Sequence, residues 1–212
     1  DQVTVKAVFW RGGPGSGKST VVKKLGLKAL GLKLVNTDSA FETGLKKAGL
    51  SLDLRKIDAN VRDGIRAKAK KITGKNLSAY IEGRLGLIFD TTSAKANKIA
   101  NYKKMLDVLG YEYKMIYVSA SLNNAQKRNE MRARKLPPEI VKADWEKAQK
   151  NANGYKSMFK RDFIEVKNDD DIKSLDNKAS KLYGKPMTWS SQFPGNKLAT
   201  AWKEQELITK KR

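Results

Sequence analysis

The residues with the clearest chemical meaning form a glycine-rich segment near the start of the chain, Arg11–Thr20. It contains the pattern Gly12-x4-Gly17-Lys18-Ser19, which is the spacing of a phosphate-binding P-loop. Glycines let the backbone N–H groups turn inward around a phosphate. Lys18 can reach the β- and γ-phosphates of a nucleotide, and the Ser19 hydroxyl can bind Mg²⁺. The predicted nucleotide contacts in this loop are Gly13, Pro14, Gly15, Ser16, Gly17, Lys18, Ser19 and Thr20.

The elements on either side of the loop support this interpretation. The apolar run Val3–Trp10 suits a strand, and Lys18–Leu30 suits a helix. A helix that begins at Lys18 directs the positive end of its dipole at a bound anion. The alternative is a glycine-rich turn that only closes a tight connection between a strand and a helix.

Two aspartates follow the next two predicted strands. Asp38 comes after Lys33–Asn36, and Asp90 comes after Leu85–Phe89. In a parallel sheet of this kind, ligands bind outside the carboxyl ends of the strands. The chain has no histidine, so Asp38 is the candidate base that deprotonates an acceptor hydroxyl. Asp90 is a candidate ligand of Mg²⁺, and Asp90 and Thr91 are candidate contacts of the substrate. Either aspartate could instead cap the helix that follows it.

Three arginines precede the double proline Pro137-Pro138 on a predicted helix, Leu122–Lys135. They are Arg128, Arg132 and Arg134. This arrangement is typical of a mobile lid that brings guanidinium groups onto phosphates. Arg128 is the predicted catalytic arginine of this lid, and Arg132 a predicted nucleotide contact. The alternative is a solvated basic face of a helix.

The alternation of helices and strands predicts the fold. We expect an α/β domain of the P-loop NTPase type, with a mostly parallel five-stranded sheet and helices on both faces. The domain should span residues 1–184, and a C-terminal tail, whose Trp189 and Trp202 would anchor it, should span 185–212. The remaining predicted helices and strands are a helix from Thr37, a helix over Ile57–Thr73 that Gly74 interrupts and Leu77–Ile81 could resume, Lys95–Gly110, Tyr111–Ser119, Glu139–Asn153, Phe163–Val166 and Ile172–Tyr183.

Composition limits the range of functions. The net charge is +22, which favours a polyanionic partner such as nucleic acid or else a lysine-rich solvated surface. The chain has no cysteine, so it forms no disulfide and has no thiolate chemistry. We predict no membrane span and a cytoplasmic location, in the host if a phage encodes the protein. Because the first residue is Asp1 and not Met, we expect a chain processed or cut from a longer polypeptide.

Together these motifs resemble a known group of P-loop kinases. The P-loop, Asn36-Thr37-Asp38, Phe89–Thr92 and Lys127-Arg128-Asn129 with Arg132 are similar, in order and spacing, to zeta toxins and to phage polynucleotide kinases. The stretch Tyr80–Gly86 looks more like zeta-toxin-like predicted kinases of tailed phages. The resemblance implies an ATP- or GTP-dependent kinase acting on a hydroxyl. It implies that Lys18 and Ser19 hold nucleotide and Mg²⁺, that Asp38 is the base and that Arg128 is the lid arginine.

One feature of that group is missing. Its members usually carry an arginine shortly after the base aspartate to hold the substrate phosphate, but Phe41 and Glu42 occupy this region here. Arg62 and Arg84 are the predicted replacements, with Arg55 and Arg66 as further candidates. The acceptor is therefore open between a polynucleotide 5′-hydroxyl and a small nucleotide-type molecule. The same motifs would also suit a nucleic-acid-stimulated ATPase or a non-catalytic nucleotide-binding module of a larger phage protein.

Overall fold

The structure is a computed structural model that describes residues 6–18, 31–90 and 96–169. Its centre is a five-stranded sheet in the order β2-β3-β1-β4-β5, and every neighbouring pair of strands is parallel. The strands are β1 (Lys6–Arg11), β2 (Lys33–Val35), β3 (Leu87–Asp90), β4 (Glu112–Ser119) and β5 (Phe163–Lys167). This confirms the predicted α/β fold with a parallel five-stranded sheet.

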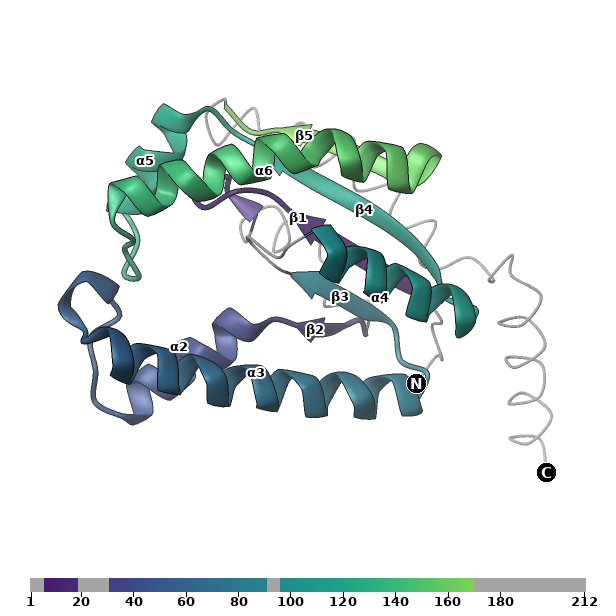
Figure 1. The fold of residues 1–212 in the computed structure, drawn as a ribbon. Coiled ribbons are helices and arrows are strands. Elements are labelled where there is room, and N and C mark those ends of the chain that lie inside the picture. Colours follow the sequence, from purple (N-terminus) through teal and green to yellow (C-terminus); the bar gives the residue numbers. More distant parts are fainter. Residues whose placement is uncertain (1–5, 19–30, 91–95, 170–212) are drawn as a thin grey trace.

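The helices between the strands lie as Figure 1 shows, with α2 and α3 on the side of β2 and with α5 and α6 on the side of β4 and β5. They are α2 (Thr37–Lys47), α3 (Ala59–Glu82), α4 (Ala96–Val108), α5 (Leu122–Glu130) and α6 (Pro138–Phe159), with short 3₁₀ turns η2 (Leu54–Lys56) and η3 (Lys160–Asp162). No helix in the described ranges is both long and apolar enough to cross a lipid bilayer.

The core forms because the strands are apolar on both faces, as a buried parallel sheet requires. One face of β1 places Phe9 against Phe89 at 5.0 Å and against Phe159 of α6 at 5.1 Å between ring centroids. Helices α3, α4 and α6 contribute Leu77, Ile99, Leu106, Tyr155 and Phe159 to this cluster. The other face of the sheet buries Val8, Trp10, Ile88 and Val118.

A separate small core joins α2 to α3. It contains Phe41, Leu45, Leu54 and Ala69, with the partly buried Leu136 packed against it. Phe41 and Leu45 are the residues whose helical spacing predicts this buried face of α2. Because Leu136 follows α5, this cluster also attaches the α5–α6 connection to the α2–α3 hairpin.

Two predictions of local structure are wrong. Gly74 does not interrupt the helix: α3 is continuous over 24 residues. The tertiary packing of Leu77 and its neighbours exceeds the cost of one helical glycine, about 1 kcal/mol.

The second correction concerns α5, which ends at Glu130 and not at Lys135. The Asn129 side chain donates to the Leu136 carbonyl at 2.8 Å and accepts from the Leu136 N–H at 3.0 Å. This pair of bonds closes residues 131–136 into a tight connection. Arg132 and Arg134 therefore lie in a loop, whereas Arg128 is helical. Pro138 opens α6, as predicted.

The predicted helices Lys18–Leu30 and Ile172–Tyr183, and the predicted boundary between residues 184 and 185, fall largely or entirely outside the described residues.

Candidate active site

The predicted phosphate loop follows β1 at the centre of the sheet. Strand β1 pairs with β3 on one side and with β4 on the other, so Trp10 stands opposite both Asp90 and Ile116. The chain reaches β3 through β2 on one side and then crosses to β4 on the other. This reversal is the switch point at which open parallel sheets bind ligands beyond their carboxyl ends. The P-loop and the two predicted aspartates are thus brought to the same edge.

The glycines of the loop are required by its close packing. Gly15 and Gly17 have φ angles of 71° and 84°, a left-handed conformation that side chains disfavour. A Cβ atom at Gly15 would also collide with the backbone carbonyl of Ala125 in α5. Gly13 lies against the backbone of Trp145, where an added Cβ would be 3.5 Å from the Trp145 Cα. The loop is therefore wedged between α5 and α6.

An asparagine that follows β5 clamps the loop from a third side. Asn168 is 4% exposed, and its side-chain amide donates to the Ser16 carbonyl at 2.7 Å. Its backbone N–H donates to the Ser119 carbonyl at the end of β4 at 2.8 Å. Its own carbonyl accepts from Arg128 at 2.9 Å. Sequence reasoning missed this residue, although its position just after a parallel strand is a signal for the site.

Arg128 completes the clamp. Its guanidinium donates to the Gly15 carbonyl at 3.3 Å and to the Asn168 carbonyl. Because both bonds go to backbone that forms or supports the P-loop, the structure supports a role for Arg128 in holding that loop. The contact with phosphate that the sequence predicts for Arg128 stays a prediction.

Lys18 is the buried cation of the site. It is 7% exposed, and burial lowers its pKa to about 8, partly opposed by the attraction of Asp90. Asp38, Arg132 and Arg11 also act on it electrostatically. Taking an ammonium group out of water is energetically costly, so an anion placed beside it is strongly favoured. This is the electrostatic condition that a phosphate-binding lysine needs.

Asp90 and Asn36 form a polar pair beside Lys18. The Asn36 amide donates to Asp90 Oδ2 at 2.9 Å. Burial raises the pKa of Asp90, with Lys18 acting in the opposite direction. A half-buried carboxylate at this place offers the hard oxygen donor that Mg²⁺ prefers. Within the described residues no group of three or more acidic side chains is arranged to hold a metal ion.

Asp38 is not a helix cap. The cap of α2 is Asn36, whose side chain accepts from the N–H groups of Asp38 at 2.7 Å and Ser39 at 3.4 Å. This excludes the capping alternative for Asp38, whose carboxylate instead meets two arginines. Arg66 of α3 and Arg134 of the 131–137 loop each approach Asp38 Oδ1 to 3.5 Å.

Arg132 and Arg134 differ in their surroundings. Arg134 pairs with Glu42 at 2.9 Å as well as with Asp38. The half-buried Arg132 guanidinium makes no ion pair or side-chain hydrogen bond with any residue that the structure describes. Desolvation lowers its pKa, and the like charge of Arg134 adds to this effect. Arg132 therefore is a cation that lies near Lys18, Asp38 and Asp90 and is available to a ligand.

The remaining predicted residues separate into three groups. Arg62 lines the same cavity as Asp38 and Arg132. Arg84 is not brought to the site: it follows the C-terminal end of α3, at the edge where strands begin, and donates to the Leu109 carbonyl at 3.2 Å. Its prediction as a substrate contact is wrong because only the N-terminal part of α3 lines the cavity, through Arg62 and Arg66, and Arg84 follows the opposite end of this helix. Ser19, Thr20 and Thr91 lie outside the described residues.

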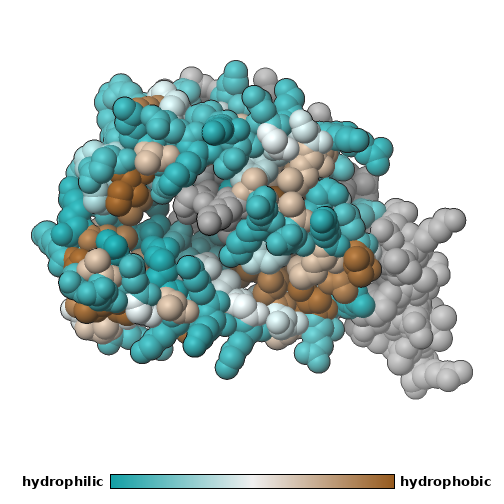
Figure 2. Space-filling model, viewed as in Figure 1, coloured by the Kyte–Doolittle hydropathy of each residue, from teal (hydrophilic) through white to brown (hydrophobic). Residues whose placement is uncertain are grey.

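The cavity beside Asp38 has a volume of about 250 Å³ and is partly open to solvent. Figure 2 shows the molecular face hollowed between the α5–α6 side and the α2–α3 side. Its charged lining comprises four arginines and three aspartates, and its apolar lining comes from Pro14, Leu54, Leu136, Pro137 and Ile140. The cavity thus adjoins the P-loop through Pro14 and the candidate base through Asp38.

Comparison with known proteins agrees with this geometry. Residues 8–154 match the model of a protein family described as an AAA domain, AAA_33. The chain belongs to this AAA-domain family. The match spans most of β1, the P-loop, both aspartates and the arginines of the 128–134 region.

Many solved structures share the fold, and one of them is similar over most of its length. It is described as "a putative kinase from chloroflexus aurantiacus j-10-fl", has a TM-score of 0.53 and 15% sequence identity, and the alignment covers 84% of this chain and 98% of that chain. This likeness shows that the two chains share a fold. No curated protein matches the chain.

Proposed function

We propose that this protein is a kinase that transfers the γ-phosphate of ATP or GTP to a hydroxyl group of a nucleotide-type or nucleic-acid acceptor. The observation that carries the proposal is the position of Asp38, which lines an open cavity together with Pro14 of the P-loop and does not cap its helix. A P-loop that served only binding would not need a carboxylate held at that point. The family match supports nucleotide binding, and the acceptor is our inference from the cavity.

The chain's own residues have distinct roles in this scheme. Backbone N–H groups of the P-loop and the Lys18 ammonium hold the β- and γ-phosphates. Asp38 accepts the proton of the acceptor hydroxyl while the hydroxyl oxygen forms a bond to the γ-phosphorus and the bond to the β-phosphate oxygen breaks. Arg132 neutralises charge on the transferred group. Phosphoryl transfer needs little more than this positioning and charge stabilisation.

Asp90 would hold Mg²⁺ together with Ser19, the residue that follows Lys18 in the sequence. The ion would neutralise charge on the nucleotide phosphates. In the absence of a histidine, no side chain described near the P-loop is better suited to proton transfer than Asp38.

The finer predictions from sequence remain proposals. They are the kinship with zeta-toxin-like phage kinases and polynucleotide kinases, and contact with nucleic acid through the basic surface. The basic residues exposed on α3, such as Lys70 and Lys71, agree with the latter but are equally typical of a solvated helix face.

The test is transfer of labelled phosphate. The protein is incubated with γ-labelled ATP or GTP, Mg²⁺ and a panel of 5′-hydroxyl oligonucleotides, nucleosides, nucleotides and nucleotide-sugars. Label on an acceptor is the expected result and names its class. Release of inorganic phosphate without a labelled acceptor would indicate an ATPase. Nucleotide binding without any turnover would indicate a non-catalytic binding module.

A further inference from the structure

Two arginines on one helix face give the acceptor cavity a cationic wall. Arg62 and Arg66 are one turn apart on α3, and both line the cavity. Like charges at this spacing destabilise a helix by a few tenths of a kcal/mol. Arg66 packs over the Phe41 ring, with 4.2 Å between its Cζ and the ring centroid. This stacking fixes its guanidinium toward the cavity, a fixed orientation that suits bidentate recognition of a planar or tetrahedral anion.

The ion pairs that these arginines make are weak. Arg66 meets Asp38 at 3.5 Å, and Arg62 meets its sequence neighbour Asp63 at 3.3 Å, where the Asp63 side chain is 67% exposed. An exposed pair such as Arg62–Asp63 contributes at most about 1 kcal/mol, and the longer separation weakens the Arg66–Asp38 pair. When the Asp38 carboxylate binds an acceptor hydroxyl, it neutralises less of the positive charge of Arg66. An anion on the acceptor would replace it.

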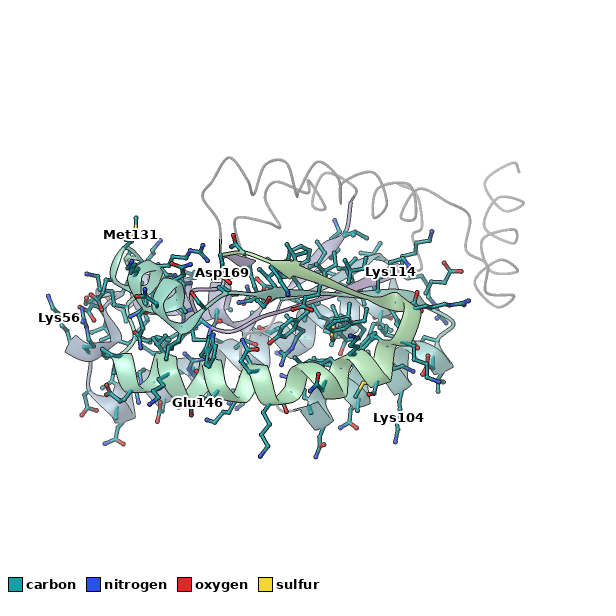
Figure 3. All side chains as sticks on the ribbon, turned by 90° about the horizontal axis from the view of Figure 1, so that it is seen from above. Lys56, Lys104, Lys114, Met131, Glu146 and Asp169 are labelled. Carbon is teal, nitrogen blue, oxygen red and sulfur yellow. The ribbon has the colours of Figure 1, made fainter. Side chains whose placement is uncertain are left out.

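The walls of the cavity are joined at its outer end. Arg55 of η2 reaches Glu130 at the end of α5 at 3.7 Å, and Arg134 pairs with Glu42 at 2.9 Å. Leu136 packs into the small core between α2 and α3. Lys56 of η2 and Met131 after α5 accordingly lie at the same end of the molecule in Figure 3. A polynucleotide needs a groove that continues past the reactive group, and these contacts interrupt such a groove.

We propose that the cavity takes a small hydroxyl compound that carries a phosphate or carboxylate group, and that Arg62 and Arg66 bind this anion while Asp38 faces the hydroxyl. The inference rests on the proposed function for the hydroxyl, but the anion site can be tested without it. Because Arg66 and Asp38 are adjacent, the anion and the accepting hydroxyl lie a few bonds apart in the same molecule. The apolar side chains Leu54, Leu136 and Ile140 line the cavity along with these charges.

The first experiment measures anion binding with the P-loop filled. Wild-type protein is saturated with Mg²⁺ and a non-hydrolysable ATP analogue, and inorganic phosphate or acetate is titrated by calorimetry. We expect one phosphate per chain. Arg62→Gln and Arg66→Gln should each weaken phosphate binding at least tenfold, whereas Lys71→Gln, an exposed site on the same helix, should leave it unchanged. Acetate binding at the same site would extend the acceptor class to carboxylates, and its absence would restrict the class to phosphates.

The outcomes separate the two proposals. Failure of wild-type protein to bind phosphate, or equal binding by Arg62→Gln, Arg66→Gln and wild type, overturns the anion site. Circular dichroism checks that each variant is folded, and agreement between the two arginine variants guards against a local defect in one. A second experiment compares acceptors in matched pairs, such as adenosine with adenosine 3′-monophosphate and glycerol with glycerate. If neutral and charged members are phosphorylated equally, the kinase stands and the anion site falls. If phosphate binds as expected but no compound is ever phosphorylated, the anion site stands and the kinase falls.

Discussion

The Asn168 clamp offers a direct test of how the P-loop is held. Asn168→Ala removes the 2.7 Å bond to the carbonyl of Ser16, a residue that is only 3% exposed, and leaves that carbonyl without its donor. A buried acceptor that loses its donor costs about 1–3 kcal/mol. If the loop instead moves so that the Ser16 carbonyl binds water, the same free energy is lost from nucleotide binding, because the loop is no longer held in its binding conformation. A cost of about 1.4 kcal/mol corresponds to a tenfold rise in the Kd for nucleotide.

The assay is calorimetric titration of Asn168→Ala with a non-hydrolysable ATP analogue, combined with urea unfolding. Asn124→Ala is the control, because the Asn124 side chain lies close by and donates to Asp169 instead of the P-loop. We expect the Kd of Asn168→Ala to rise roughly tenfold, and that of Asn124→Ala to change less than about twofold. A Kd close to that of wild type in folded Asn168→Ala would refute the idea that this asparagine preorganises the P-loop.

Three further predictions concern binding and stability. Lys18→Ala should raise the nucleotide Kd by about ten- to a hundredfold, because it removes a charged hydrogen-bond donor to the phosphates that is worth about 1.5–3 kcal/mol. Unchanged affinity in titration would contradict the P-loop assignment. Phe9→Ala should lower the free energy of unfolding in urea by about 3–5 kcal/mol, because it deletes a fully buried ring that contacts three neighbouring rings. Gly74→Ala should raise the free energy of unfolding by about 0.5–1 kcal/mol, because alanine favours the helix and an added Cβ there meets no atom within 4 Å. A destabilised variant would show that this part of α3 is misassigned.

Much of the fold could be predicted because its signals are local. Apolar runs bounded by glycine or aspartate mark the strands, and the spacing of Phe41 and Leu45 marks the buried face of α2. The P-loop carries its own context, and Asp38 and Asp90 follow from the rule that strand ends meet at one edge.

What could not be predicted depends on contacts between distant residues. Asn129 ends α5 by bonding to Leu136 across a loop, so no periodicity in the helix itself reveals the break. The clamp joins Asn168 to Ser16 across 152 positions of sequence. Arg84 shows a different error. The sequence predicts it as a substrate contact within the kinase-like stretch Tyr80–Gly86, but the fold places it at the end of α3 that is distant from the cavity.

The role of Asn36 lies between these cases. Its type and place suit a helix cap, which is a local signal. Its bond to Asp90 depends on the pairing of β2 with β3, which only the sheet establishes. Because Asn36 both caps α2 and binds Asp90, neither of these contacts uses the Asp38 carboxylate, and Asp38 lines the cavity.

The central claim is that Asp38 serves phosphate transfer and not nucleotide binding. The most direct measurement compares wild type with Asp38→Asn for transfer of label from γ-labelled ATP to the best acceptor found, with ATP affinity measured on the same samples. We expect the variant to lose roughly a hundredfold or more in transfer rate, the usual contribution of a general base, while its affinity for ATP changes little. Wild-type transfer by Asp38→Asn would contradict the claim.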